Sequence, residues 1–209
     1  MSNPDARLLA ARRIDPNDPR PPLVQALRIG LYDEWHALAV YDAVIRRFGP
    51  VRPFANIVHS EAAHAQALQR LCARHGVPLP VNDWAGKVVL PATLAECCAA
   101  GVADEIENVA MYENFLSYPM PADAVVVFNA LKTASGERHL PAFQRCLARR
   151  GVGGGRGRGQ PFAAATPGRD RPASGAPSSG VPVALALAGV VALGLGALSL
   201  LAGRHRRGA

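Results

Sequence analysis

Three acidic side chains and a histidine fall where predicted helices of this chain should be apolar. The stretch HSEAAHAQAL, residues 59–68, has the pattern of an amphipathic helix, yet Glu61 and His64 lie one turn apart on its buried face. Glu34 and Glu105 hold equivalent positions in two other helical stretches. Burying an isolated carboxylate is costly, and three together repel one another unless a cation joins them. This pattern predicts a buried metal site.

Four helical stretches are expected to position these side chains. Proline, glycine and capping signals place them at about Leu23 to Phe48, Phe54 to His75, Thr93 to Phe115 and Ala122 to Arg150. The third should begin with a capping box formed by Thr93 and Glu96. Alternating steps of four and three residues give each of the first three stretches an apolar seam that is polar only at its middle. The acidic groups should therefore meet at mid-height.

The connections predict how these helices are arranged. Few residues separate the first stretch from the second or the third from the fourth, so each pair should form an antiparallel hairpin. The segment between the pairs, GVPLPVNDWAGKVVLP, is long enough at about 3.3 Å per residue to cross a bundle about 30 Å long. Residues 22–150 are thus expected to form an all-α, ferritin-like antiparallel four-helix bundle with a long crossover.

The ligand types indicate which metal the site would hold. Glu and His three residues apart on one helix, with single Glu residues on its neighbours, is the ligand pattern of di-iron and di-manganese carboxylate bundles. Carboxylate and imidazole suit iron and manganese better than a structural zinc site, which prefers thiolates. We therefore expect two iron or manganese ions per chain.

Four segments also carry a resemblance to a known family. YDEWHALAVYDAVIRRFG, PFANIVHSEAAHAQAL, AGVADEIENVAMY and SGERHLPAF resemble the four helices of an uncharacterised domain family in the ferritin-like superfamily. The resemblance covers about residues 22 to 149. It implies metal-ligating positions at Glu34, Glu61, His64 and Glu105, and a fourth-helix histidine at His139. It implies no substrate.

The fourth stretch departs from the di-iron pattern. A second Glu-x-x-His would need a carboxylate three residues before His139, where the chain has Gly136. Glu137 points about 200° away from His139 on a regular helix, so it can join the site only if the backbone bends. Pro141 removes a hydrogen bond to the carbonyl of Glu137, which predicts a kink between Gly136 and Pro141. Glu137 is a further candidate ligand if that kink forms.

Charge and cysteine content argue against other classes of protein. The net charge is +7, but residues 151–209 hold seven Arg against one Asp, so the predicted bundle is nearly neutral. Nucleic acid is therefore not expected as a partner. The four cysteines show no C-x-x-C spacing, and we expect free core thiols rather than a disulfide framework or a zinc knuckle.

The segments outside the bundle predict membrane attachment. Residues 1–21 should form a mobile N-terminal arm and residues 151–180 a disordered Gly/Pro/Arg linker. Residues 181–203 carry no charge and are long enough for a single-pass C-terminal transmembrane helix in the lipid bilayer, followed by the basic tail 204–209. This ending also resembles bacterial C-terminal sorting signals. A stripe of small residues in the span would let two copies pack as a homodimer.

Two sequence signals bear on which side of the membrane the bundle lies, and they point in opposite directions. Without a secretory signal peptide the bundle is expected on the cytoplasmic side, whereas the RHRR sequence after the span favours the opposite orientation. Two functions are compatible with these features. One is a membrane-tethered di-iron oxidoreductase, either a ferroxidase or an enzyme that reduces oxygen or a peroxide. The other, which Gly136 favours, is a metal-free bundle serving as a membrane-anchored interaction or structural module.

Overall fold

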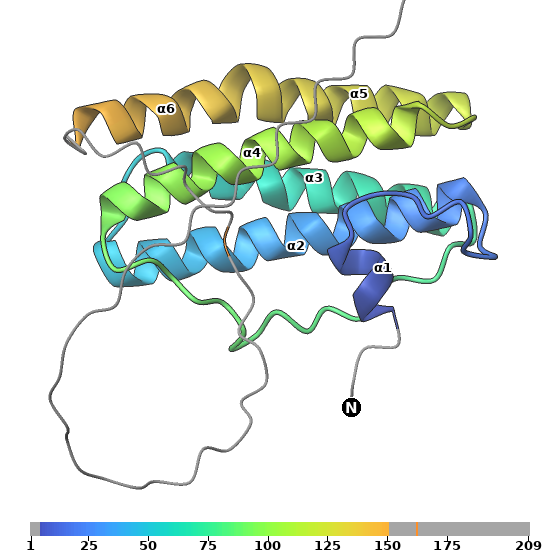
Figure 1. Ribbon diagram of the computed structural model, residues 1–209, viewed down its shortest axis with the longest axis horizontal. Helices are drawn as coiled ribbons and strands as arrows, with labels where there is room; N and C mark the ends of the chain where they lie inside the picture. Colours follow the sequence, from blue (N-terminus) through green and yellow to red (C-terminus); the bar gives the residue numbers. More distant parts are fainter. Residues whose placement is uncertain (1–4, 151–161, 163–209) are drawn as a thin grey trace, which may run out of the picture. The chain divides into compact units, whose positions relative to one another are not determined.

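The computed structural model describes residues 5–150 and Phe162. Within this part of the chain, α5, a π-helical segment η1 and α6 follow one another without a break, so four main helices form an all-α bundle (Figure 1). This confirms the expected helical bundle. The elements are α1 (Ala6–Ala10), α2 (Pro22–Phe48), α3 (Phe54–Arg74), α4 (Leu94–Leu116), α5 (Ala122–Ala134), η1 (Ser135–His139) and α6 (Leu140–Arg149).

Local sequence signals explain where the main helices begin and end. At the start of α4, the Thr93 hydroxyl accepts a hydrogen bond from the Glu96 N–H, and the Glu96 carboxylate accepts one from the Thr93 N–H. The predicted capping box is therefore confirmed. Helix α2 has a proline in its first turn and ends before Gly49, whose φ of 82° is readily adopted only without a side chain.

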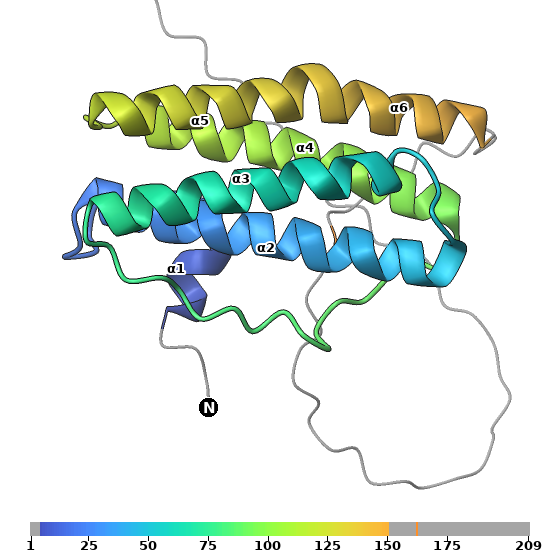
Figure 2. The ribbon, with the colours of Figure 1, turned by 180° about the vertical axis from the view of Figure 1, so that it is seen from behind.

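The order of the helices places all four around one interior. The short turn after α2 returns the chain as α3, antiparallel to α2 (Figure 1). The long connection between α3 and α4 then runs along the bundle, so that α4 has the same direction as α3 (Figure 2). The α5–η1–α6 helix returns antiparallel to α4. Each main helix thereby presents its middle turns to the same level of the interior.

Two apolar clusters occupy the two ends of this interior. The first takes side chains from the N-terminal half of α2, the C-terminal parts of α3 and α4, and α5; it includes Leu27, Leu68, Phe115 and Phe128. The second takes side chains from the opposite halves of those helices and from α6; it includes Tyr41, Phe54, Phe143 and Phe162. On each of α2, α3 and α4, the buried acidic residues come between the residues of one cluster and those of the other along the sequence. The polar layer is therefore closed at both ends by hydrocarbon.

The N-terminal segment differs from the mobile arm that its proline content suggests. Residues 6–10 form α1, and Leu8, Leu9 and Ile14 are buried. These side chains belong to the first apolar cluster, with residues of α2 and α4. Burial of three aliphatic side chains stabilises the segment against the bundle more than its composition indicates.

The cysteines are a second correction. Cys98 of α4 and Cys146 of α6 form a disulfide, while Cys72 and Cys97 are free and buried. The two bonded cysteines are 48 residues apart in sequence, and only the packing of α4 against α6 brings their Cα atoms to 5.9 Å. Their spacing along the chain therefore carried no signal of the pairing.

The segments that were expected to attach the bundle to a membrane are not among the described residues. The linker over 151–180, apart from Phe162, the transmembrane helix over 181–203 and the tail 204–209 fall outside the described residues. Among the residues that are described, no helix is both long enough and apolar enough to cross a bilayer.

One helix contact gives a stability prediction. A Cβ atom added at Gly101 of α4 would lie 2.6 Å from the ring of buried Phe143, whereas one at Gly30 of α2 would make only ordinary contacts, the nearest at 3.4 Å. Gly101→Ala should lower the free energy of unfolding by about 1–3 kcal/mol because the ring must move. Gly30→Ala, the matched control, should change it little or raise it by about 0.5–1 kcal/mol. Urea unfolding of both variants measures this, and equal effects would contradict the contact.

Candidate metal centre

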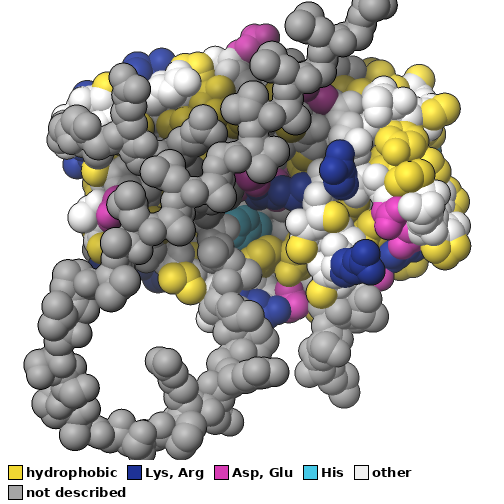
Figure 3. All heavy atoms as spheres, viewed as in Figure 1, with side chains coloured by type: hydrophobic (Ala, Val, Ile, Leu, Met, Phe, Trp, Pro, Cys, Tyr) yellow, Lys and Arg dark blue, Asp and Glu magenta, His cyan; other side chains and the backbone are white. Residues whose placement is uncertain are grey.

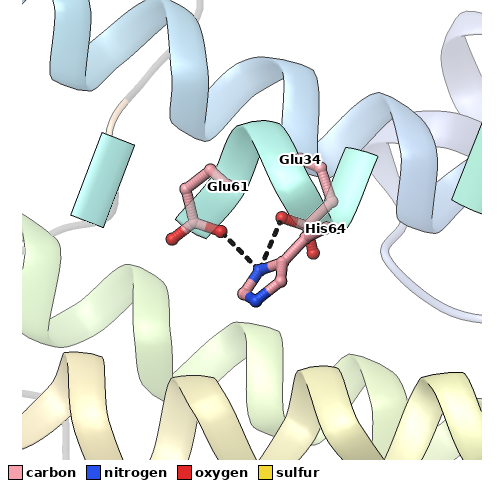
Figure 4. Close-up of side chains that lie close together, drawn as sticks. All are labelled: Glu34, Glu61 and His64. Atoms are coloured by element: carbon pink, nitrogen blue, oxygen red, sulfur yellow. Dashed lines mark hydrogen bonds and ion pairs between the residues drawn. The ribbon is translucent and has the colours of Figure 1, made fainter. Parts of the chain in front are cut away.

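Three side chains from two helices form the first cation-binding group. Glu34 of α2 and Glu61 and His64 of α3 point toward one another, with the imidazole between the two carboxylates (Figure 4). His64 Nδ1 lies 2.8 Å from Glu61 Oε2 and 3.4 Å from Glu34 Oε2. Both glutamates are buried, and the His64 side chain is 14% exposed. One imidazole nitrogen and two carboxylates thus face a common point.

A second group lies beside the first and shares Glu61 with it. His139, the last residue of η1, places Nδ1 3.1 Å from Glu61 Oε1 and 3.5 Å from Glu105 Oε1 of α4. All three side chains are buried. The His64 and His139 rings are stacked with their centroids 5.6 Å apart. The two oxygens of Glu61 therefore face two different imidazoles.

The groups meet a simple test of whether they suit metal ions. In each group the candidate ligand atoms lie within 4.8 Å of one another. His139 Nδ1 and Glu34 Oε2 are buried and make ion-pair contacts, with Glu61 and His64 respectively, but no hydrogen bond. Buried polar atoms are normally hydrogen-bonded, so one such atom without a hydrogen bond in each group is consistent with a site that takes a cation. The donors are two buried Glu/His groups that can hold metal ions.

Two tyrosines hold the outer carboxylates. The Tyr112 hydroxyl of α4 donates to Glu34 Oε1 of α2 at 2.7 Å, and the Tyr41 hydroxyl of α2 donates to Glu105 Oε1 of α4 at 3.0 Å. Helix α2 thus supplies the candidate ligand Glu34 and the tyrosine that binds Glu105, and α4 supplies Glu105 and the tyrosine that binds Glu34. Such bonds orient the carboxylates. Glu34 receives the tyrosine on Oε1 and faces His64 with Oε2, whereas Oε1 of Glu105 contacts both Tyr41 and His139.

The backbone of η1 decides which residues of the fourth main helix face the centre. The Leu140 N–H bonds to the Ser135 carbonyl five residues earlier, as in a π-helix. Pro141 lacks an N–H and would clash with the Glu137 carbonyl in a regular helix, which favours this wider turn over the expected kink. Ser135 and His139 both face inward and are buried.

Glu137 does not join the five other candidate ligands. It is exposed, as is its neighbour Arg138, and it belongs to neither cation-binding group. The wider turn brings His139 inward without rotating residue 137 toward the interior. Among the described residues of α5 and η1, His139 is the one member of these groups.

Burial and mutual charge set the protonation of the carboxylates. Burial, with the neighbouring charge of Glu61, raises the pKa of Glu34 to about 8, and burial raises that of Glu105 to about 7. Burial also opposes ionisation of Glu61, but the adjacent imidazoles of His139 and His64 outweigh it and lower its pKa to about 2. Glu61 is therefore the carboxylate that stays charged.

The imidazoles show the complementary shift. Burial disfavours their charged forms, yet the carboxylates of Glu34 and Glu61 raise the pKa of His64 to about 10. The carboxylates of Glu105 and Glu61 likewise raise the pKa of His139 to about 9. Without metal at neutral pH, the centre thus carries protons on both histidines and on Glu34.

Several polar residues around the centre were not among the sequence candidates. Asp33, Asp104, Asn108 and Ser135 are buried beside the ligands, and Arg12 and the two tyrosines contact them or the ligands. A short repeat in the sequence indicates four of these residues, the two aspartates and the two tyrosines. Asp-Glu followed by Tyr seven residues after the Glu occurs twice: Asp33-Glu34 with Tyr41, and Asp104-Glu105 with Tyr112.

The pKa shifts predict that metal binding releases protons. Both imidazoles are protonated below about pH 9, and Glu34 below about pH 8, so each must lose its proton before it can bind a cation. Affinity of the full chain for Mn²⁺ or Co²⁺ should therefore strengthen as the pH rises from about 6 to 9. Loading the centre at pH 7 should release about three protons per chain.

Calorimetric titration in buffers of different ionisation enthalpy counts these protons. His64→Asn should remove about one proton from the count. His59→Asn, an exposed position on the same helix, should leave it unchanged. An affinity that does not vary with pH would contradict the assignment of His64 and His139 as ligands.

Comparison with known proteins supports the fold. No protein-family model matches the chain, and no curated protein matches it. The structure is similar to the crystal structure of hypothetical protein MJ0754 from Methanococcus jannaschii, with a TM-score of 0.57 and 22% sequence identity, over 66% of this chain and 86% of that one. At this identity the similarity shows a shared helical-bundle fold alone.

Proposed function

We propose that this chain is a ferritin-like protein with a two-ion carboxylate centre of iron or manganese, acting as a ferroxidase or as an oxidoreductase that reduces oxygen or a peroxide. The observation that carries the proposal is the position of Glu61. Its Oε2 faces His64 of the first group, and its Oε1 faces His139 of the second. A carboxylate placed in this way is suited to bridge two cations.

The residues divide into two ligand sets. Glu34 and His64 would hold one ion, Glu105 and His139 the other, and Glu61 would contact both. An iron or manganese pair supplies one-electron redox chemistry toward oxygen or a peroxide when bound. The chain's own part is to orient the ligands, with Tyr112 and Tyr41 fixing the outer carboxylates, and to keep water out of the layer between the two apolar clusters.

The nature of the donors supports iron or manganese. Both groups consist of carboxylate oxygens and imidazole nitrogens, and no cysteine belongs to either. Two of the four cysteines are in a disulfide and the other two are outside the groups. Oxygen-rich sites with imidazole suit iron and manganese, whereas thiolates favour zinc or copper.

The ferritin-like assignment and the membrane anchor are parts of the same proposal. Two antiparallel helix pairs joined by a connection along the bundle is the arrangement of ferritin-like folds, and it supports the assignment. Attachment to a membrane by residues 181–203 rests on the uncharged sequence of that segment.

Metal content tests the proposal directly. The full chain, loaded with Fe(II) without oxygen and freed of excess metal, should hold two irons per chain by elemental analysis, one for each group. Glu61→Ala should abolish binding because it removes a ligand from both groups at once. His59→Ala on the same helix should still bind two, since His59 is exposed and outside the groups.

The oxidation step is tested on the same loaded protein. Exposure to oxygen or hydrogen peroxide should oxidise the bound iron in wild type and in His59→Ala. The optical absorption of Fe(III) measures this oxidation. If the wild-type chain binds no metal, the buried groups serve only as a charge network. In that case the bundle is better described as an interaction or structural module.

A further inference from the structure

Arg12 makes an unusual set of contacts for a residue outside the main helices. Its guanidinium binds three carboxylates: Asp33 of α2 at 2.5 Å, Asp104 of α4 at 2.8 Å and Glu107 of α4 at 2.6 Å. The two aspartates are buried, whereas Glu107 is about half exposed. Figure 3 shows basic, acidic and histidine side chains adjoining one another on the face viewed there. The N-terminal segment thereby joins α2 to α4 through the guanidinium group of Arg12.

The aspartates that Arg12 joins are the direct neighbours of metal-ligand candidates. Asp33 precedes Glu34, and Asp104 precedes Glu105, in the repeated Asp-Glu pair. One of these glutamates belongs to each cation-binding group. The distance between Glu34 and Glu105 therefore depends on the distance between Asp33 and Asp104, which both bind the Arg12 guanidinium.

The contacts continue inward from Asp33 to the element that carries His139. Asp33 Oδ1 binds Arg12, and its Oδ2 accepts a hydrogen bond from the Asn108 amide at 2.9 Å. Asn108 in turn accepts one from the Ser135 hydroxyl at 2.8 Å. Ser135 is the first residue of η1, and His139 is the last. Arg12 is thus connected to α2, α4 and η1, three of the four elements that supply ligands.

The backbone of Arg12 adds a separate observation. Its φ is +50°, and Arg12 is the one residue other than glycine with a positive φ among the described residues. A residue with a side chain adopts this conformation rarely, and it persists where the surrounding contacts demand it. The buried aliphatic residues on either side, Leu9 and Ile14, fix the segment against the bundle. The chain is therefore held so that the guanidinium reaches the aspartate pair.

We propose that Arg12 is a positioning residue of the metal centre, holding α2 and α4 at the separation that Glu34 and Glu105 need to bind two ions. The inference rests on the proposed metal centre. Without the guanidinium, Asp33 and Asp104 would be two buried carboxylates facing one another, and their repulsion would move the helices apart or draw in protons. Either change would displace the adjacent ligands.

Three variants of the full chain test this role. Arg12→Ala removes the guanidinium, and Arg12→Lys keeps a charge that cannot form the same fork to two carboxylates. Arg20→Ala is the matched control, because Arg20 pairs with Asp5 and Asp18 in the same segment and is in neither cation-binding group. Affinity for Co²⁺ and the visible spectrum of the bound ion are measured together with the melting temperature.

We expect Arg12→Ala to weaken Co²⁺ binding about 10- to 100-fold and to alter the spectrum, as is usual when a residue supporting metal ligands is lost. Arg12→Lys should lose less, and Arg20→Ala should bind like wild type. Guanidinium ion at millimolar concentration should partly restore binding to Arg12→Ala by taking the vacated position. A residue with only a structural role would change the melting temperature without changing the spectrum.

The inference is overturned if folded Arg12→Ala matches Arg20→Ala in affinity and spectrum, even with a lowered melting temperature. It is also overturned if Arg12→Ala binds a third ion while the first two bind unchanged, since Arg12 would then only occupy a cation's place. If Arg12→Ala does not fold, Arg12→Lys and Asp104→Asn replace it in the test: each should weaken Co²⁺ binding relative to Arg20→Ala and alter the spectrum, because each disrupts the contact between Arg12 and Asp104. A wild-type chain that binds no Co²⁺ would instead overturn the metal centre itself.

Discussion

The charge of Glu61 in an apolar interior is the constraint on which the rest of the site depends. Its carboxylate lies at mid-height of the bundle, with an apolar cluster on each side, and one imidazole faces each of its oxygens. Because a buried carboxylate needs compensating charge, two further glutamates beside it require either protons or cations. The same arrangement explains the raised pKa of both histidines and the buried atoms without hydrogen-bond partners.

A near-symmetry of α2 and α4 organises the residues around this charge. Each helix carries the Asp-Glu pair and a tyrosine seven residues beyond the glutamate, and each tyrosine binds the glutamate of the other helix. Arg12 binds the aspartates of both pairs. The two candidate ligands Glu34 and Glu105 are therefore restrained both by the tyrosines and through the neighbouring aspartates, so the N-terminal segment contributes to their positions.

The other two elements that carry candidate ligands do not share this symmetry. Helix α3 supplies Glu61 and His64 from one regular turn, whereas the fourth main helix supplies only His139, from a π-helical segment. The wider turn accommodates Pro141, brings Ser135 inward and leaves Glu137 in solvent. A centre with a single carboxylate shared between its two groups is the result.

Helical periodicity in the sequence was sufficient to determine the four main helices, the Thr93 capping box and the inward faces of Glu34, Glu61, His64 and Glu105, because these depend on neighbours within one or two turns. Tertiary structure alone decided the features that join distant segments. The Cys98–Cys146 disulfide, the tyrosine bonds across the bundle and the contacts of Arg12 each link residues more than 20 positions apart. The outward direction of Glu137 also required the structure, since a proline predicts a disturbed helix without saying whether it kinks or widens.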